Sequence, residues 1–118
     1  MDAFPEFMKN PANRISTETQ YTQGIEGFVF DGVDGSQMAF WTYPGGGKSA
    51  EHVHDYDEYF TVVHGQYTVL MNGKRIPVGV GEEILIPQGT LHSGEALPGT
   101  RAIYAFGGKR AKRVKESF

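Results

Sequence analysis

The chain has 118 residues, with 11 lysines and arginines against 14 aspartates and glutamates and a formal net charge of −3 at pH 7. This length predicts one domain, and so mild a charge does not favour a polyanionic partner such as nucleic acid. The absence of cysteine excludes a disulfide scaffold, a thiolate-ligated zinc or iron–sulfur site and a cysteine nucleophile.

The N-terminal segment carries Asp2 and Glu6 but neither a basic stretch nor an apolar run, so we expect no signal peptide. No apolar segment of the sequence approaches the ~18 residues that a membrane span needs. We therefore expect a cytoplasmic protein with no membrane partner. Pro5 and Pro11 predict a turn or an arm at this end of the chain.

The apolar residues that follow recur with a period of two, which indicates β-strands. Glycine-rich turns separate short runs of β-branched and aromatic residues, and this spacing predicts an all-β sandwich or barrel. The expected strands lie at 28–30, 38–43, 58–63, 67–71, 83–86 and 102–106.

Asn72-Gly73 is the clearest hairpin signal, between the apolar run 67–71 and a second strand at 74–78. A two-residue type I′ turn needs positive φ at both central residues, which asparagine and glycine tolerate best. Pro77 has no backbone N–H to donate, so it predicts that the second strand lies at a sheet edge or a bulge.

The C-terminal segment from Gly107 onward is basic, and we predict a short helix or a frayed, solvated coil. Nucleic-acid binding would also need a second basic face with exposed aromatic residues, and we do not expect a nucleic-acid partner. The cations of this segment are Lys109, Arg110, Lys112, Arg113 and Lys115.

Three of the four histidines have a spacing suited to a metal site. His52 and His54 would point to the same face of a strand, because side chains alternate with period two. Glu58 begins the next expected strand, and His92 follows a turn at the start of a later one. Three imidazoles and a carboxylate suit iron, manganese, nickel, copper or zinc.

The residues from Gly46 to Gly65 resemble the first motif of the cupin family. The pattern G-x5-H-x-H-x3-E-x6-G is matched at every fixed position, which places its histidines at His52 and His54 and its carboxylate at Glu58. The resemblance is specific because many fixed positions match at the same spacing.

The second cupin motif, G-x5-P-x-G-x2-H, is matched by Gly81, Pro87, Gly89 and His92. The family motif usually ends in asparagine, where this chain has Ala96. The 15 residues between Gly65 and Gly81 are similar to the short spacing of small microbial cupins.

The resemblance implies an all-β, single-domain cupin jelly-roll barrel. Residues 1–20 would form an N-terminal arm, 21–107 the barrel and 108–118 a basic C-terminal tail. The ligands of one divalent transition metal (Fe, Mn, Ni, Zn or Cu) would then be His52, His54, Glu58 and His92. Small cupins are mostly homodimers, so the resemblance also implies a homodimer, with the N-terminal segment as a plausible exchanged arm.

Several aromatic side chains are candidates for the barrel core or for a pocket that binds a small molecule. Arg101 would be a carboxylate clamp if it points inward, but a position at the surface is favoured. For His64, and for the carboxylates of Asp55 and Asp57, we favour solvated positions. The substrate-binding candidates are Trp41, Tyr43, Phe60 and Tyr104.

Two functions remain open. The first is a metal-dependent enzyme acting on a small oxygen-rich molecule such as a sugar derivative, keto acid or enediol, by dioxygenase or by isomerase or lyase chemistry. Glu58 would then be both a ligand and the catalytic base. The alternative is a non-catalytic cupin module that binds a small ligand, because fold does not decide function.

Overall fold

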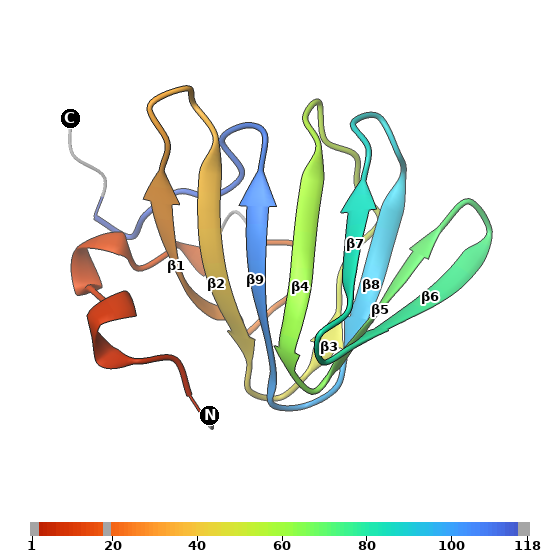
Figure 1. Ribbon diagram of the computed structural model, residues 1–118, viewed down its shortest axis with the longest axis horizontal. Helices are drawn as coiled ribbons and strands as arrows, with labels where there is room; N and C mark the ends of the chain where they lie inside the picture. The colour runs from red at the N-terminus through yellow and green to blue at the C-terminus, as the bar shows by residue number, and fades with distance from the viewer. Residues whose placement is uncertain (1–2, 18–19, 116–118) are drawn as a thin grey trace.

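The computed structural model describes residues 3–17 and 20–115, which form two facing antiparallel sheets (Figure 1). One sheet has the strand order β1-β2-β9-β4-β7 and the other has the order β3-β8-β5-β6. The strands are β1 (Glu26–Asp31), β2 (Gln37–Tyr43), β3 (Gly47–Lys48), β4 (Glu58–His64), β5 (Gln66–Met71), β6 (Lys74–Gly79), β7 (Glu83–Ile86), β8 (His92–Ala96) and β9 (Thr100–Phe106). This architecture confirms the all-β jelly-roll prediction.

The core lies between the two sheets, and strand alternation fills it. On β4, Glu58, Phe60 and Val62 are buried while Tyr59 is exposed. Phe60 and Val62 are fully buried, as is Val69 on the facing sheet. The period of two in the sequence therefore marks the inward face correctly.

The predicted hairpin joins β5 to β6. Asn72 has a φ of 53° and Gly73 a φ of 72°, so both central residues adopt the positive φ that a type I′ turn requires. Pro77 lies on β6, which is an edge strand, as predicted. β6 can tolerate this residue because a strand at the edge leaves one row of N–H groups outside the ladder.

The N-terminal segment covers part of the outer face of the larger sheet. It contains two 3-10 helices, η1 (Glu6–Met8) and η2 (Pro11–Asn13). Phe4 packs there against Phe40, with ring centroids 5.6 Å apart. Among the described residues, no helix is long and apolar enough to cross a membrane.

Arg101 lies beneath this segment, and the prediction of a surface position is wrong. The residue is 4% exposed, and its guanidinium carbon lies 4.9 Å from the centroid of the Phe4 ring. It alternates with inward-facing Ala102, so it does not point into the barrel as a clamp.

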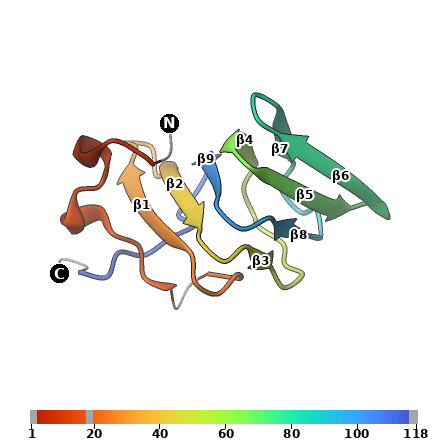
Figure 2. The same ribbon diagram turned by 90° about the horizontal axis from the view of Figure 1, so that it is seen from below.

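The C-terminal tail is not a helix or a frayed coil over its described residues, which end at 115. It runs beside the N-terminal segment (Figure 2), where Arg113 forms a bridge with Ile15. The side chain of Gln37 holds it: its carbonyl accepts from the N–H groups of Arg110 and Ala111, and its amide donates to the Ala111 carbonyl. Residues 1–2, 18–19 and 116–118 of the predicted arm and tail lie outside the described residues.

Candidate metal centre

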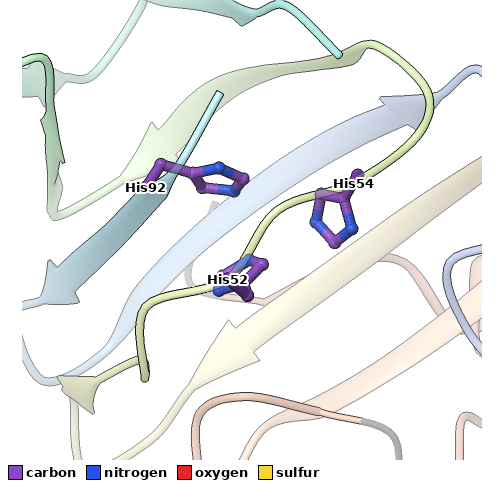
Figure 3. A group of neighbouring side chains, drawn as sticks. All are labelled: His52, His54 and His92. Carbon is purple, nitrogen blue, oxygen red and sulfur yellow. The ribbon is translucent and has the colours of Figure 1, made fainter. Parts of the chain in front are cut away.

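The backbone brings the three predicted histidines together between the sheets (Figure 3). His52 and His92 form an antiparallel bridge, with N–H to carbonyl distances of 2.9 and 3.0 Å. The His54 carbonyl accepts from the N–H of Gly89 at 2.8 Å. Ligand nitrogens of the three imidazoles lie within 4.8 Å of one another.

The local structure around His52 and His54 differs from the prediction. These residues do not lie in a regular strand: His52 makes the isolated bridge, and His54 is in an irregular stretch before β4. The extended backbone still keeps the two rings on one side, with centroids 4.8 Å apart. The prediction that they share a face is therefore confirmed without the predicted strand.

Hydrogen bonds at Nδ1 orient the imidazoles. His52 Nδ1 donates to the Ala50 carbonyl at 2.7 Å, and His92 Nδ1 donates to the Thr90 carbonyl at 2.8 Å. A carbonyl only accepts, so Nδ1 carries the proton in both rings. In the neutral form, Nε2 of each ring then has a lone pair that is available to a metal.

Glu58 faces these nitrogens from the start of β4. Its Oε1 lies 3.3 Å from His54 Nε2 and 3.8 Å from His92 Nε2. Despite these short distances, both Nε2 atoms are buried and have no partner in hydrogen-bond geometry among the described residues. Leaving such atoms unsatisfied is costly, and a metal ion would satisfy both of them.

The charge states also suit a cation. Burial acts to raise the pKa of Glu58, but the interactions with His54 and His92 outweigh it and lower the pKa to about 2. Burial lowers the pKa of His52 to about 4. For His92, burial lowers the pKa, but Glu58 and the Thr90 carbonyl outweigh it and raise the pKa. An ionised Glu58 carboxylate beside a neutral His52 imidazole fits a divalent transition metal, which would compete with a proton for His92.

A cavity of about 30 Å³ adjoins this cluster, enough for about two water molecules. Predicted substrate-binding residues Trp41, Tyr43 and Tyr104 line it, whereas Phe60 does not. Phe60 instead packs behind the wall, 4.9 Å from the Tyr104 ring and 5.3 Å from the Tyr67 ring. The other lining residues are Tyr21, Thr22, Ile25, Ser49, His52, Glu58, Tyr67, Val69, Ile86, His92, Ser93, Phe106 and Arg110.

A family model for the cupin domain matches residues 39–104, which are more than half of the chain and include both motifs and the histidine cluster. The chain belongs to the cupin family. A comparison with curated protein sequences finds no match.

Solved cupin-like structures share the fold. KdgF from Halomonas sp. is 22% identical, with a TM-score of 0.66, and the match covers 81% of this chain and 93% of that one. The polyketide cyclase RemF from Streptomyces resistomycificus is 20% identical, with a TM-score of 0.68 and coverage of 90% and 82%. An RmlC-like cupin from Shewanella frigidimarina is 17% identical, with a TM-score of 0.66 and coverage of 80% and 89%.

Three tyrosines of the cupin cavity carry phenols that stay protonated. The hydroxyls of Tyr43 and Tyr104 lie 2.6 Å apart, and burial raises the pKa of both well above the usual value. Burial also raises the pKa of Tyr67 to about 12. One hydroxyl of the Tyr43–Tyr104 pair donates to the other, which leaves a second proton that can be donated to a bound oxygen.

Other sequence-based expectations concern residues outside the cavity. His64 is exposed, as predicted, and its Nδ1 lies 2.9 Å from the Gly99 carbonyl oxygen. Asp55 and Asp57 are also exposed, although Asp57 accepts a hydrogen bond from the N–H of Gln88 at 2.8 Å. None of the three lines the cavity.

Sequence reasoning missed Tyr21, Tyr56 and Arg110. The Tyr21 ring stacks on His52 with centroids 3.8 Å apart and an interplanar angle of 9°. The guanidinium carbon of Arg110 lies 4.8 Å from the centroid of the same ring. Neither residue belongs to a cupin motif, so only the folded arrangement places them at the cluster.

Tyr56 contacts the His54 imidazole through both its hydroxyl and its ring. Its hydroxyl lies 3.1 Å from His54 Nδ1, and the two rings stack with centroids 4.8 Å apart. The backbone of the tail packs closely against the Tyr56 ring at Gly108, where an added Cβ would lie only 2.5 Å from Cδ2 of that ring. When Nε2 of His54 binds a metal, the protonated Nδ1 can donate to the phenol oxygen.

Tyr56→Phe is therefore expected to weaken metal affinity about 10- to 100-fold, because it removes the hydroxyl but keeps the stacked ring. A competition titration with a chelating dye measures the affinity. The matched control is Tyr59→Phe, which removes a hydroxyl that donates to Glu83 on the exposed outer face. Equal affinities for the wild type and Tyr56→Phe would contradict this role.

Proposed function

We propose that the chain is a metal-dependent enzyme acting on a small oxygen-rich molecule. His52, His54, His92 and Glu58 would hold one divalent transition metal. The observation that carries the proposal is the pair of buried, unsatisfied Nε2 atoms of His54 and His92 facing an ionised carboxylate. A structural cluster would satisfy these groups internally.

The residues around the cluster suit catalysis on an oxygen-bearing ligand. Ile25, Val69 and Ile86 contribute apolar side chains to the wall and limit the access of water. The phenols of Tyr43 and Tyr104 remain protonated and would donate a hydrogen bond to a substrate oxygen.

Glu58 is the proposed base. Glu58 lies on β4 with its carboxylate at the histidine cluster. When its bond to the metal loosens, the carboxylate would be able to take a proton from the substrate. The metal itself would supply an electrophile for isomerase or lyase chemistry or, if redox-active, dioxygen-dependent oxidation.

The second candidate is a non-catalytic module that binds a small ligand. The raised pKa values of the cavity phenols favour it, because these groups do not exchange protons readily near neutral pH. The carboxylate and imidazole groups among the described lining residues are those of Glu58, His52 and His92. The structural similarity to KdgF and to the polyketide cyclase RemF does not discriminate between the two candidate functions, because it concerns the fold alone.

Elemental analysis of protein purified without an affinity tag or chelator tests the proposal. We expect about one transition-metal ion per chain, as purified or after reconstitution. The metal-loaded protein is then assayed for dioxygen consumption and for isomerisation or cleavage of small keto acids, sugars and enediols, with metal-free protein as the control. Absence of metal after reconstitution would overturn the metal site. Metal uptake without metal-dependent turnover across this panel would favour the binding module.

A further inference from the structure

The three imidazoles of the cluster are not covered equally. His54 is 9% exposed and His92 is 5% exposed, whereas His52 is half-buried and lies in an isolated bridge outside the regular strands. Its Nδ1 donates to the Ala50 carbonyl, but one hydrogen bond at a site that water can reach holds a ring weakly, because water competes for both partners. His52 therefore needs a second contact to keep its ligand nitrogen at the cluster.

The ring of Tyr21 supplies that contact. It stacks on the His52 imidazole with centroids 3.8 Å apart and an interplanar angle of 9°, which is van der Waals contact between overlapping faces. To turn over about its Cβ–Cγ bond, the imidazole would have to pass through an orientation perpendicular to the tyrosine ring. At this separation its edge would then overlap the tyrosine, so the stack opposes the flip that exchanges Nε2 with Cε1.

Tyr21 is itself held from two sides. Its carbonyl accepts from the Ala50 N–H at 3.2 Å, and the Ala50 carbonyl accepts from His52 Nδ1 at 2.7 Å. These two hydrogen bonds and the ring stack close a loop of contacts through three residues. The imidazole occupies one face of the tyrosine ring, and over the other face the guanidinium carbon of Arg110 lies 4.8 Å from the centroid. The ring of Tyr21 is thus fixed between a cation and the imidazole.

The ring, and not the hydroxyl, is the part of Tyr21 that acts on His52. Within residues 3–17 and 20–115, the Tyr21 hydroxyl makes no hydrogen bond. Tyr56 differs, because its hydroxyl lies 3.1 Å from Nδ1 of His54 in addition to the ring stack. Removal of the hydroxyl alone should therefore matter at Tyr56 and not at Tyr21.

We propose that Tyr21 is a positioning residue of the metal centre, whose ring holds the His52 imidazole in the orientation that keeps its ligand nitrogen at the cluster. Tyr21 acts through His52 and is not itself a ligand. This inference rests on the proposed function, and it adds to the site a residue that lies outside both cupin motifs.

The first test measures Co(II) affinity by competition with a chelating dye, and ligand geometry by the visible spectrum of the bound Co(II). Tyr21→Leu keeps an apolar side chain but removes the flat ring, so it should weaken Co(II) binding about tenfold or more and alter the spectrum. Tyr21→Phe keeps the ring and should bind Co(II) within about twofold of the wild type, with an unchanged spectrum.

The second test needs no metal. In metal-free protein, nitrogen-15 NMR of the imidazoles shows which ring nitrogen carries the proton. At about pH 8, where an ordinary imidazole is neutral, the wild type and Tyr21→Phe should show His52 protonated at Nδ1 alone. Tyr21→Leu should show a mixture of both tautomers, because its imidazole can flip. Failure of the wild type to bind Co(II) would overturn the proposed function, and these spectra would still decide the role of Tyr21.

The matched control is Tyr59→Leu, which makes the same change on the outer face of β4, where Tyr59 is 36% exposed. It should leave the Co(II) affinity, the Co(II) spectrum and the His52 tautomer unchanged. Tyr21 is 41% exposed and lies outside the strands, so we expect its variants to fold, which circular dichroism checks. If Tyr21→Leu does not fold, the more flexible Tyr21→Met takes its place.

Two results would contradict the positioning role. One is a Tyr21→Leu variant that keeps either the wild-type Co(II) affinity or the wild-type His52 tautomer. The other is a Tyr21→Phe variant that is impaired as strongly as Tyr21→Leu, which would assign the effect to the hydroxyl.

Discussion

Replacing His52 and His54 together with alanine is expected to reduce bound transition metal from about one ion per chain to background. Each imidazole offers a ligand nitrogen within 4.8 Å of the others in the cluster, and Glu58 and His92 alone are too few to replace two lost imidazoles. Elemental analysis after reconstitution and desalting measures the loss. The expected effect is large because both residues would coordinate the ion directly.

His64→Ala is the matched control for this double variant. It removes the one histidine of the sequence that lies outside the cluster, which is exposed and does not line the cavity. The control should retain metal at the wild-type level. Circular dichroism of the double variant checks that the barrel is intact. A folded double variant that still binds one ion per chain would place the metal elsewhere.

Phe60→Ala is expected to lower the free energy of unfolding by about 3–5 kcal/mol, the usual cost of removing a buried phenylalanine. The side chain is fully buried and packs on the rings of Tyr67 and Tyr104. Its loss would leave a cavity behind the wall of the site. Urea denaturation measures the change.

Phe7→Ala provides the matched control, because Phe7 is 84% exposed. Its effect should stay within about 0.5 kcal/mol, as for most surface substitutions. If Phe60→Ala fails to fold, the milder Phe60→Leu should still show a clear loss of stability. A loss for Phe60→Ala no larger than that for Phe7→Ala would show that this core position is not needed.

The histidine cluster was predictable from sequence because its geometry depends on short-range spacing. His52 and His54 are separated by one residue, and any extended backbone places such a pair on one side, whether or not a sheet forms there. His92 was also a candidate from its place after a turn, and the cupin resemblance strengthened it, because short-range spacing alone does not pair segments 40 residues apart. The hairpin at Asn72-Gly73 was predictable for a local reason too, namely its backbone preference.

The cavity wall was predicted only in part. Trp41, Tyr43 and Tyr104 do face inward, and alternation places Phe60 on the same face as Glu58. Alternation distinguishes the inner face from the outer one, but it does not show which inner side chain lies in front of another. Tyr67, on the facing sheet, takes the position at the cavity that was expected for Phe60.

The tail was predicted wrongly because its position depends on a distant partner. A run of lysines and arginines after a glycine reads as a solvated end. The side chain that holds it, Gln37, is a single polar residue on β2, 74 positions from Ala111. No local pattern identifies that contact, and therefore none identifies Arg110 as a cavity residue.

The anchoring of the tail by Gln37 makes two distant events thermodynamically linked. A small molecule that fills the cavity contacts the tail at Arg110 and so binds only its docked form, which means that occupancy of the cavity must also stabilise docking. Ligand would then slow amide hydrogen exchange at Ala111, although it touches nothing there. Conversely, loss of the Gln37 amide would weaken ligand binding from outside the cavity. The chain end would thus behave as a reporter of what the barrel contains.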